Sequence, residues 1–584
     1  HIPAGYTYDK FFDYRLNPEH PPLVKMLSGI PLLTQNLKFP AESSAWQTDI
    51  NGQWAAGSQF LYESGNDANQ IIFLARIFPI LITILLVIAV YFCGKEILGK
   101  WWALLPSLFI ALSPNFLAHG HYVTTDVGAA LGIFLSVFAF ANFLTHPSKN
   151  NMLIAGLAFG LAQLIKFSAA LLIPFFILLI SIFYIHSVIR DINQTQPSAR
   201  LKRFGIRFFR YFRATFIVFV VGYILVFLVY AVATWNYPVS KQVADIQAQV
   251  GNFNPHILVD ATIWMAKTKV LKPFAEYSLG VIMVLQRSAG GNNAYFLGQL
   301  SSKGWWYYFP LIYLMKESLP ILMVVFSALL LTLGDIFNNF KKGIKYASGK
   351  LNEYLNISFM EFSMLLFVII YWAYSMKSPL NIGFRHLMPS LPFIYILSVK
   401  AVKKWITVLP QITPANYSDK LLFYIKWLKD ASIKAIILFT LIIWFIITPL
   451  AIYPNFLSRY NELFGGTYNG HKYATDSNFD WGQDLNRLEK WVEENNIQKI
   501  AVDYFGGGSP KYSLGDKFEP WWSAKGNPKE IGIEWLAISV NSLRGSLATP
   551  VSGFNQNPED KYSWLENPLS PTARAGASIF IYKL

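Results

Sequence analysis

Charged residues and cysteines are scarce in this chain of 584 residues. Only 14% of the residues are charged, whereas soluble globular chains average about 25%. Cys93 is the single cysteine, so the chain forms no internal disulfide. The sequence also shows no classical secretory signal peptide, no internal repeat and no low-complexity tail. These absences argue against a large soluble enzyme and against a disulfide-stabilised secreted domain.

Hydrophobic residues are abundant instead. They make up 53% of the chain, and the mean hydropathy is +0.34. Because a helix needs roughly 20 apolar residues to cross a bilayer, runs of about that length predict membrane spans. We expect ten spans, of which 152–165 and 387–399 are short. The ten predicted spans are 71–93, 102–118, 127–144, 152–165, 168–185, 214–235, 310–333, 359–375, 387–399 and 433–453.

The net charge of +15 follows the predicted topology. The alternate loops 94–101, 145–151, 189–213, 334–358 and 400–432 together hold 20 basic residues against 6 acidic ones. Lysine and arginine concentrate in cytoplasmic loops of membrane proteins, so we expect these five loops to face the cytoplasm. The positive charge is therefore a topology signal, and we expect no nucleic-acid partner. Ten crossings then place both ends outside, and a further span before His1 is expected.

Three larger segments should lie on the outer face. Residues 1–70 are expected to form interfacial helices, and residues 236–309 a large outer loop within the transmembrane domain 71–453. Residues 454–584 read as a small soluble α/β or α+β domain: 484–497 is an amphipathic helix pattern, and 499–506 and 534–540 are strand patterns. The fold class is thus an α-helical polytopic membrane protein with a small C-terminal domain.

The stretch "NPEHPP" places two polar side chains, Glu19 and His20, between prolines. Proline fixes its own φ and favours an extended residue before it, so this stretch is predicted to be stiff and non-helical. Such a bracket suits side chains that must point in one direction. A simple helix start, with proline in the first turn and Glu19 near the positive end, explains the same residues equally well.

A second polar cluster, "HGHYVTTD", falls between two apolar runs at their outer ends. Asp126 is costly at a membrane boundary unless it is solvated, paired or functional. The simpler explanation is that Asp126 caps the next helix, and capping does not exclude a catalytic role. His119 and His121 resemble a metal pair only weakly.

Two basic sites occupy the same outer layer. Lys166 interrupts an apolar stretch at a predicted tight turn, where it either extends to the interface or offers a point charge to a phosphate. Arg385 and His386 stand where a span re-enters the membrane; Arg385 either anchors the helix or grips a phosphate with its planar fork. Acids, histidines and cations gathered at one water–lipid boundary suit a reaction on a lipid-borne phosphate. A transporter would instead place polar groups near the bilayer midplane.

With these residues in view, the sequence resembles a family. The stretches "NPEHPPLVKMLSGIPLL", "HGHYVTTD", "GWWYYFP", "LMKESLP", "GFRHLMPSLPF" and "DSNFDWGQDLNRLEKW" are similar to those of prokaryotic protein-mannosyltransferase-like glycosyltransferases. These are integral-membrane enzymes of the C-type superfamily that use polyprenyl-phosphate-linked sugars. The resemblance is scattered from residue 1 to about residue 490.

The resemblance implies an inverting transfer of a hexose, mannose in the name-giving members, from the lipid carrier to an acceptor hydroxyl. Asp126 would be the acid at the start of a later span, and Glu19 would belong to the first outer loop. His20, Lys166, Arg385 and His386 would hold the carrier phosphate. A divalent metal stays open, with Glu19, His119, His121 and Asp126 as weak candidate ligands.

The resemblance also points to a residue outside the given sequence. In such proteins the main first-loop acid belongs to an Asp-Glu pair just upstream of a His-Ile-x-Ala-Gly-Tyr stretch, and this chain begins with "HIPAGY". We therefore expect the main base immediately before His1, which puts the activity of the chain as given in doubt.

Several assignments stay open at this point. The acceptor is a protein, a lipid or a cell-surface glycan, and the oligomeric state is unknown. The expected location is a prokaryotic plasma (inner) membrane, with the active site and the C-terminal domain extracytoplasmic. The alternatives to an enzyme are a transporter or flippase for a lipid-linked sugar, and a non-catalytic membrane scaffold.

Overall fold

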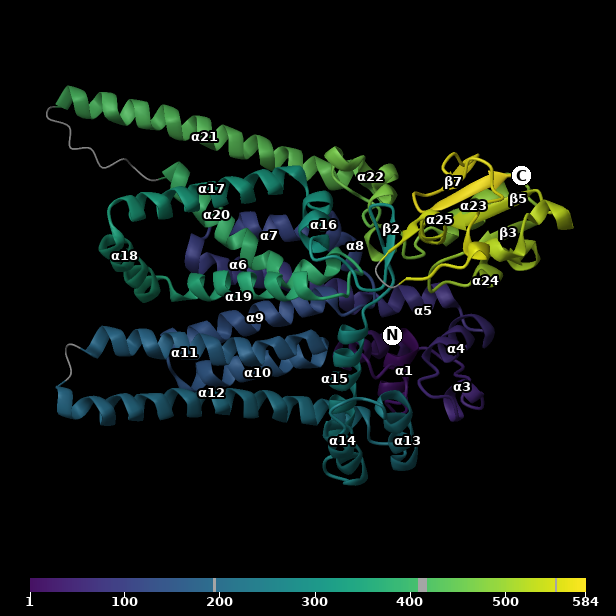
Figure 1. The fold of residues 1–584 in the computed structure, drawn as a ribbon, viewed down its shortest axis with the longest axis horizontal. Coiled ribbons are helices and arrows are strands. Elements are labelled where there is room, and N and C mark those ends of the chain that lie inside the picture. Colours follow the sequence, from purple (N-terminus) through teal and green to yellow (C-terminus); the bar gives the residue numbers. More distant parts are fainter. Residues whose placement is uncertain (193–195, 408–416, 552–553) are drawn as a thin grey trace.

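Long, roughly parallel helices form most of the molecule (Figure 1). The computed structural model describes residues 1–192, 196–407, 417–551 and 554–584. Seven helical stretches of the described residues are long and apolar enough to cross a membrane. Because seven of the ten predicted runs fall on them, the prediction of a polytopic helical membrane protein is confirmed. Their elements are α5 (Ala68–Ala75) with α6 (Ile77–Leu98), α9 (Asp126–Thr145), η3 (Phe167–Leu171) with α11 (Leu172–Asp191), α12 (Pro197–Ala233), α17 (Leu319–Lys341), α19 (Phe359–Lys377) and α21 (Tyr417–Ile452).

The other three predicted spans are not among these seven. The run 102–118 is divided into α7 (Leu104–Ala111) and α8 (Pro114–His119), because Pro114 cannot continue a helix but is well placed to start one. α10 (Lys149–Ile165) and α20 (Leu391–Thr407) have 17 residues each. At about 1.5 Å per residue such a helix is about 26 Å long, somewhat less than a bilayer core of about 30 Å. Two of the three predicted runs thus form short helices, and only the run 102–118 is broken in two, since an apolar run does not reveal where its helix breaks.

α9 is the central helix of the bundle. In its apolar window 89% of the residues are buried, whereas the corresponding share is 22–39% in the other six candidate spans. Small residues such as Ala129, Ala130 and Ala141 let the neighbouring helices approach closely. The first residue of α9, Asp126, is therefore carried into the protein interior.

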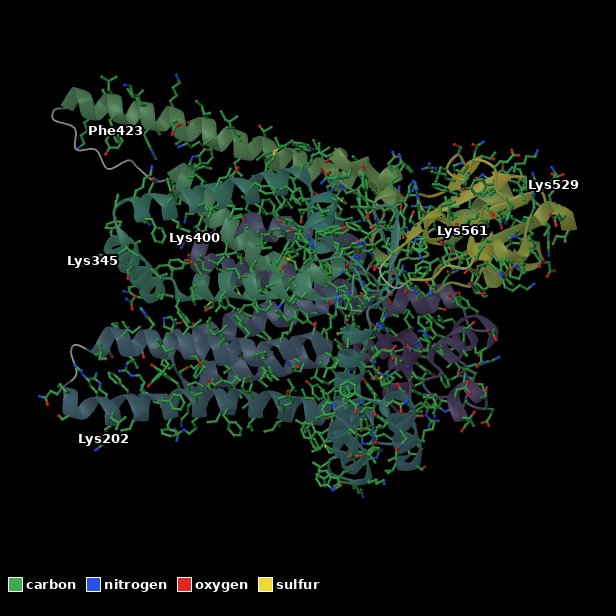
Figure 2. The ribbon with its side chains drawn as sticks, in the orientation of Figure 1. Lys202, Lys345, Lys400, Phe423, Lys529 and Lys561 are labelled. Carbon is green, nitrogen blue, oxygen red and sulfur yellow. The ribbon has the colours of Figure 1, made fainter. Side chains whose placement is uncertain are left out.

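The two ends of the helix bundle carry different segments of the chain. The segments around α11–α12 and around α18 (Ile344–Ile357) lie at one end, where Lys202 and Lys345 are marked (Figure 2). The N-terminal segment, the helices within residues 239–290 and the C-terminal sheet lie at the other end (Figure 1). Parts of the predicted basic loops 189–213 and 400–432 lie outside the described residues. The described parts of the predicted basic loops 189–213 and 334–358 thus lie at the same end of the helix bundle.

The N-terminal segment contains short helices, and its prolines lie before these helices or in their first turns. A separate lobe follows α12 and leads into a β-hairpin, α16 and, before α20, a 3-10 turn. The N-terminal elements are α1 (Ile2–Lys10), α2 (Leu23–Gly29), η1 (Ile30–Thr34), α3 (Ser44–Gln47), α4 (Gln53–Ser58) and η2 (Gln59–Glu63). The later elements are α13 (Val239–Val250), α14 (Ile257–Lys267), α15 (Lys272–Gly290), β1 (Ala294–Phe296), β2 (Gln299–Ser301), α16 (Tyr308–Lys316) and η5 (Phe384–Ser390).

The C-terminal segment folds around a five-stranded mixed sheet in the order β4-β3-β5-β8-β7. β3 pairs in parallel with β4 and β5, while β8 is antiparallel to β5 and β7. Its helices and strands are α22 (Gly466–Asn469), α23 (Leu485–Glu494), β3 (Ile500–Asp503), α24 (Pro510–Leu514), β4 (Phe518–Pro520), β5 (Trp535–Ser539), α25 (Val540–Leu547), β6 (Thr549–Pro550), β7 (Ala573–Ala575) and β8 (Ile579–Lys583). Its 3-10 turns are η6 (Glu462–Phe464), η7 (Gly470–Lys472), η8 (Asp476–Asn478), η9 (Gly515–Lys517), η10 (Ser523–Lys525), η11 (Pro528–Ile531) and η12 (Pro558–Asp560).

The amphipathic helix and both strands predicted for this segment are confirmed as α23, β3 and β5. Leu485, Leu488 and Val492 of α23 pack on the sheet at the helical spacing that the sequence showed. The segment is also tied to the bundle. The buried Nζ of Lys316 at the end of α16 donates to the carbonyls of Leu457 and Asn478, both at 2.6 Å. Residues 457–478 are thereby fixed against the helices that carry the candidate site.

Candidate active site

One carboxylate and two cations form the centre of the site. The Nζ of Lys166 lies 2.6 Å from Oδ1 of Asp126, and a terminal nitrogen of Arg385 lies 3.4 Å from Oδ2. The Asp126 side chain is 2% exposed, whereas those of Lys166 and Arg385 are 15% and 18% exposed. The three residues come from separate parts of the chain, so the fold assembles this cluster.

Asp126 reaches this cluster because it does not cap its own helix. Thr125 is the N-cap of α9, and no side chain makes a capping hydrogen bond there. Asp126 is instead the first helical residue, where the positive end of the helix favours a negative charge. Its carboxylate is left to face Lys166 and Arg385. The capping explanation is therefore wrong for Asp126.

Two chain reversals place the cations. Lys166 is the C-cap of α10, with the extended dihedral angles φ −152° and ψ 132°, and confirms the predicted turn. Arg385 follows Gly383, whose φ of +142° is rarely adopted by other residues. A Cβ on Gly383 would lie 2.2 Å from Oγ of Ser477. The backbone N–H of Phe384 donates to Oδ1 of Asn478 at 2.9 Å, so the C-terminal segment fixes the turn that carries Arg385.

The cluster has an excess of positive charge and of unused polar groups. One carboxylate faces two cations, which leaves a net charge of about +1. Nε of Arg385, Nε2 of His386 and Nδ1 of His119 are buried and have no hydrogen-bond partner among the described residues. Buried polar nitrogens without partners are costly unless a ligand or water satisfies them. The donor set therefore fits an anion with several oxygens, such as a phosphate.

His20 lies in the same electrostatic environment. Burial, followed by the charges of Lys25 and Lys166, holds its pKa well below the usual range of histidine, so the imidazole is neutral at pH 7. The buried Nζ of Lys25 donates to the carbonyls of Asn17 and His20, both at 2.7 Å. Asn17 adopts a positive φ of 58°. The prediction of a non-helical stretch is confirmed, because α2 begins only at Leu23.

Glu19 contacts neutral amides and pairs with neither Lys166 nor Arg385. Its two carboxylate oxygens accept hydrogen bonds from Gln53 at 2.8 Å and from Asn51 at 3.0 Å. Among the described residues Glu19 makes no ion pair. Since the helix starts beyond it, the explanation of Glu19 as a helix-start residue is wrong. The structure brings His20, Lys166, Arg385 and Asp126 into one environment and leaves Glu19 bound to neutral amides.

The four candidate metal ligands, Glu19, His119, His121 and Asp126, form no recognisable metal-binding group among the described residues. His119 packs edge-on against Trp481 with ring centroids 5.7 Å apart, and burial lowers its pKa to about 3. Nδ1 of His121 lies 2.9 Å from the carbonyl of Leu117. Within the described part of the chain, no group of three or more His, Cys, Asp and Glu residues is arranged to hold a metal ion. The described residues therefore do not fit a metal site.

Trp481 is a site residue that the sequence did not reveal. Its ring lies 4.5 Å from the guanidinium carbon of Arg385 and contacts the rings of His119 and Tyr122. This geometry is a cation–π contact at a partly desolvated position. Trp481 belongs to the quoted stretch "DSNFDWGQD", but a tryptophan in a chain with 18 of them gives no signal of its own.

The fold and the cluster together define a class: a multi-pass helical membrane protein with a cationic, phosphate-compatible site at one end of its helices. A family match makes this more specific. Residues 68–194 match the family model described as dolichyl-phosphate-mannose-protein mannosyltransferase. The matched segment runs from α5 to α11 and contains Asp126 and Lys166. The resemblance to protein-mannosyltransferase-like glycosyltransferases is confirmed over this segment.

Comparisons with other proteins give only distant similarities. Among curated proteins no sequence matches the chain. ArnT from Cupriavidus metallidurans bound to undecaprenyl phosphate is 12% identical with a TM-score of 0.40, and the match covers 92% of this chain and 87% of that one. The apo oligosaccharyltransferase of Archaeoglobus fulgidus is 11% identical with a TM-score of 0.39, covering 94% and 67%. No functional conclusion rests on these similarities.

Proposed function

We propose that the protein is an inverting glycosyltransferase that moves a hexose from a polyprenyl-phosphate carrier to an acceptor hydroxyl. The observation that carries the proposal is the excess positive charge around Asp126, together with the unpartnered buried Nε of Arg385. The family match of the segment that holds Asp126 and Lys166 supports it. By the distribution of basic loops, the site faces outward from a prokaryotic plasma membrane.

The proposed chemistry uses the carboxylate and the cations in sequence. Lys166, Arg385 and the neutral His20 and His386 bind the carrier phosphate, whose oxygens compete with Asp126 for the two cations. Asp126, released from its ion pairs, takes the proton of the acceptor hydroxyl. The acceptor oxygen then attacks the anomeric carbon on the face opposite the phosphate. The sugar–phosphate C–O bond breaks, and its electron pair leaves with the phosphate, which the cations stabilise.

The first loop offers two further positions for a carboxylate that takes the proton of the acceptor hydroxyl: Glu19, and the position immediately before His1. Glu19 stays a second candidate acid, oriented by Asn51 and Gln53. The ring of His1 packs edge-on against His20 at 4.8 Å, and its Nδ1 lies 2.7 Å from the carbonyl of Val123. An acid immediately preceding His1 would therefore enter beside His20. We expect an Asp-Glu pair added before His1 to raise the transfer rate; an unchanged rate would remove this part of the proposal.

A reconstituted assay separates the enzyme from its alternatives. Vesicles containing the protein are supplied with polyprenyl-phosphate mannose labelled in the sugar, together with a membrane extract as acceptor source. The proposal expects label in the acceptor and one polyprenyl phosphate released per sugar transferred. A flippase would move the intact sugar-lipid across the bilayer without breaking the bond, and a scaffold would do neither.

A further inference from the structure

A polar cavity of about 190 Å³ lies beside the Asp126 cluster. Its walls come from the start of α6, the α8–α9 connection and the chain that follows α21. Its polar lining includes Arg76, His121, Tyr122, Asn455, Gln483 and Arg487. The mechanism proposed above uses none of them.

Arg76 is the unusual member of this lining. Its guanidinium carbon lies 5.5 Å from the ring of Tyr122, but among the described residues Arg76 makes no hydrogen bond or ion pair through its side chain. Arg487, a second cation of the lining, donates to Asp484 at 2.7 Å and to Asn455 at 2.6 Å, and Asp484 lines the cavity as well. One cation of the cavity is thus neutralised and the other is not.

The other polar groups near Arg76 can also form further hydrogen bonds. The phenol of Tyr122 makes no side-chain hydrogen bond with the described residues, and His121 uses only Nδ1. The charge of Arg76 acts on both of them. A half-buried guanidinium with a phenol and an imidazole beside it is a donor set for an oxyanion.

A contact between aromatic rings links the cavity to the site. The ring of Tyr122 contacts Trp481 with centroids 5.7 Å apart, and the guanidinium of Arg385 lies over the same indole. The cavity lies at the same end of the helices as the site, because Arg76 belongs to the first part of the α5–α6 stretch and Pro454 follows the end of α21. Two aromatic rings, those of Tyr122 and Trp481, therefore separate the cavity from Arg385.

We propose that this cavity binds a phosphate-type anion carried by the acceptor substrate, with Arg76 as its cation. The volume is below the roughly 300–1,000 Å³ typical of complete small-molecule sites, so the cavity takes a charged group and not a whole acceptor. The inference rests on the proposed transfer only in assigning the anion to the acceptor. It narrows the acceptor to a phosphate-bearing lipid or glycan.

A chemical protection experiment tests the anion site without any variant. The purified protein is treated with phenylglyoxal, which modifies arginine, and the modified fractions of Arg76 and Arg574 are measured by mass spectrometry. Arg574 is the matched control, because its guanidinium also lies over an aromatic ring, 4.4 Å from that of Phe580. The probes are inorganic phosphate, dihexanoyl phosphatidate and neutral dihexanoylglycerol.

We expect the phosphate probes to slow modification of Arg76 at least fivefold and to leave Arg574 unchanged. Protection by both probes assigns the site to phosphate itself, and protection by the phosphatidate alone assigns it to a lipid headgroup. Dihexanoylglycerol should not protect. Modification of Arg76 at the same rate with and without both phosphate probes would overturn the proposal.

A kinetic experiment tests the assignment to the acceptor. In Arg76→Gln, we expect half-maximal transfer to need at least tenfold more acceptor extract, with an unchanged requirement for the polyprenyl-phosphate sugar. Arg76→Lys should recover part of the loss and serves if Arg76→Gln does not fold; Arg574→Gln should behave like wild type. An effect on the donor requirement instead would contradict the assignment. If wild type transfers no sugar, the proposed function fails, while the protection result still decides the anion site.

Discussion

The guanidinium of Arg385 lies over the ring of Trp481 at 4.5 Å while one of its terminal nitrogens reaches Asp126 at 3.4 Å. The indole belongs to the C-terminal segment, the carboxylate to the central helix, and Arg385 itself to η5. This arrangement holds a planar cation between an aromatic face and an acid. Three parts of the chain therefore have to fold together before the cation is in place.

Replacing Arg385 by lysine should lower kcat/KM for the lipid-linked sugar by about 10²–10³-fold, because lysine keeps the charge but loses the fork and the stacking. The matched control is Arg15→Lys. Arg15 also pairs with an aspartate, Asp13 at 2.6 Å, and lies over Trp46 at 4.1 Å. Initial rates against donor concentration measure the effect. Equal losses in both variants would show that Arg385 contributes only to folding.

Trp481→Ala should reduce the transfer rate by at least about tenfold, since it removes the surface that orients Arg385 and His119; a cation–π contact at a desolvated position is worth about 2 kcal/mol. Trp481→Phe should recover most of the activity. Trp522→Ala is the control, because Trp522 also contacts a cation, Lys525 at 4.3 Å, but is half exposed. A fully active Trp481→Ala would remove Trp481 from the site.

Asp480 should make the stability of the protein depend on pH. Burial raises its pKa to about 7, although the N–H groups of Gly482 and Asn541 oppose the shift. A carboxyl group with a higher pKa in the folded state binds more protons there than in the unfolded state. Its stabilising contribution is therefore present at low pH and falls between about pH 4 and 7, by at most about 1.4 kcal/mol per pH unit.

The measurement is the thermal midpoint of the purified protein between pH 5 and 8. The midpoint should fall as the pH rises, and Asp480→Asn should flatten this dependence. Asp516→Asn, at a fully exposed carboxylate, should keep the wild-type slope. A slope that survives in Asp480→Asn would assign the titration to another group.

Gly5→Ala should destabilise the first loop by about 1–3 kcal/mol through overpacking. A Cβ there would lie 1.9 Å from the carbonyl oxygen of Lys25, the residue whose amine holds Asn17 and His20. Gly57→Ala is the control in the same loop, where the nearest atom would be 3.8 Å away. The thermal midpoint should fall in Gly5→Ala and stay or rise in Gly57→Ala. Equal midpoints would contradict the close packing of α1 on α2.

Polar residues at predicted span ends were the part of the site that the sequence revealed. Asp126, Lys166 and Arg385 interrupt apolar runs at one predicted level, and a charge at a membrane boundary is conspicuous because it is costly there. The sequence predicted no role for Trp481 and Arg76, because neither residue is unusual at its position. A tryptophan in a soluble segment and an arginine at the start of a span are both common structural residues, and only the fold shows what they face.

The fold was predictable where a single helix or strand decides the pattern. α23, β3 and β5 follow from local periodicity. The division of the run 102–118 into two helices was not predictable, because Pro114 interrupts an apolar stretch that otherwise has the length of a span. The role of Glu19 was also not predictable, since its partners Asn51 and Gln53 come from a distant turn of the same loop.

The central claim is that the carboxylate of Asp126 acts on the acceptor hydroxyl, and its substitution tests this most directly. The measurement is transfer of labelled sugar from polyprenyl-phosphate mannose in vesicles, with wild type, Asp126→Asn and Asp13→Asn at matched amounts of folded protein. Asp13→Asn is the control, because it removes another buried carboxylate paired with an arginine. The account predicts a rate lower by about 10²–10⁴-fold in Asp126→Asn and a nearly wild-type rate in Asp13→Asn. Equal transfer by wild type and Asp126→Asn would contradict it.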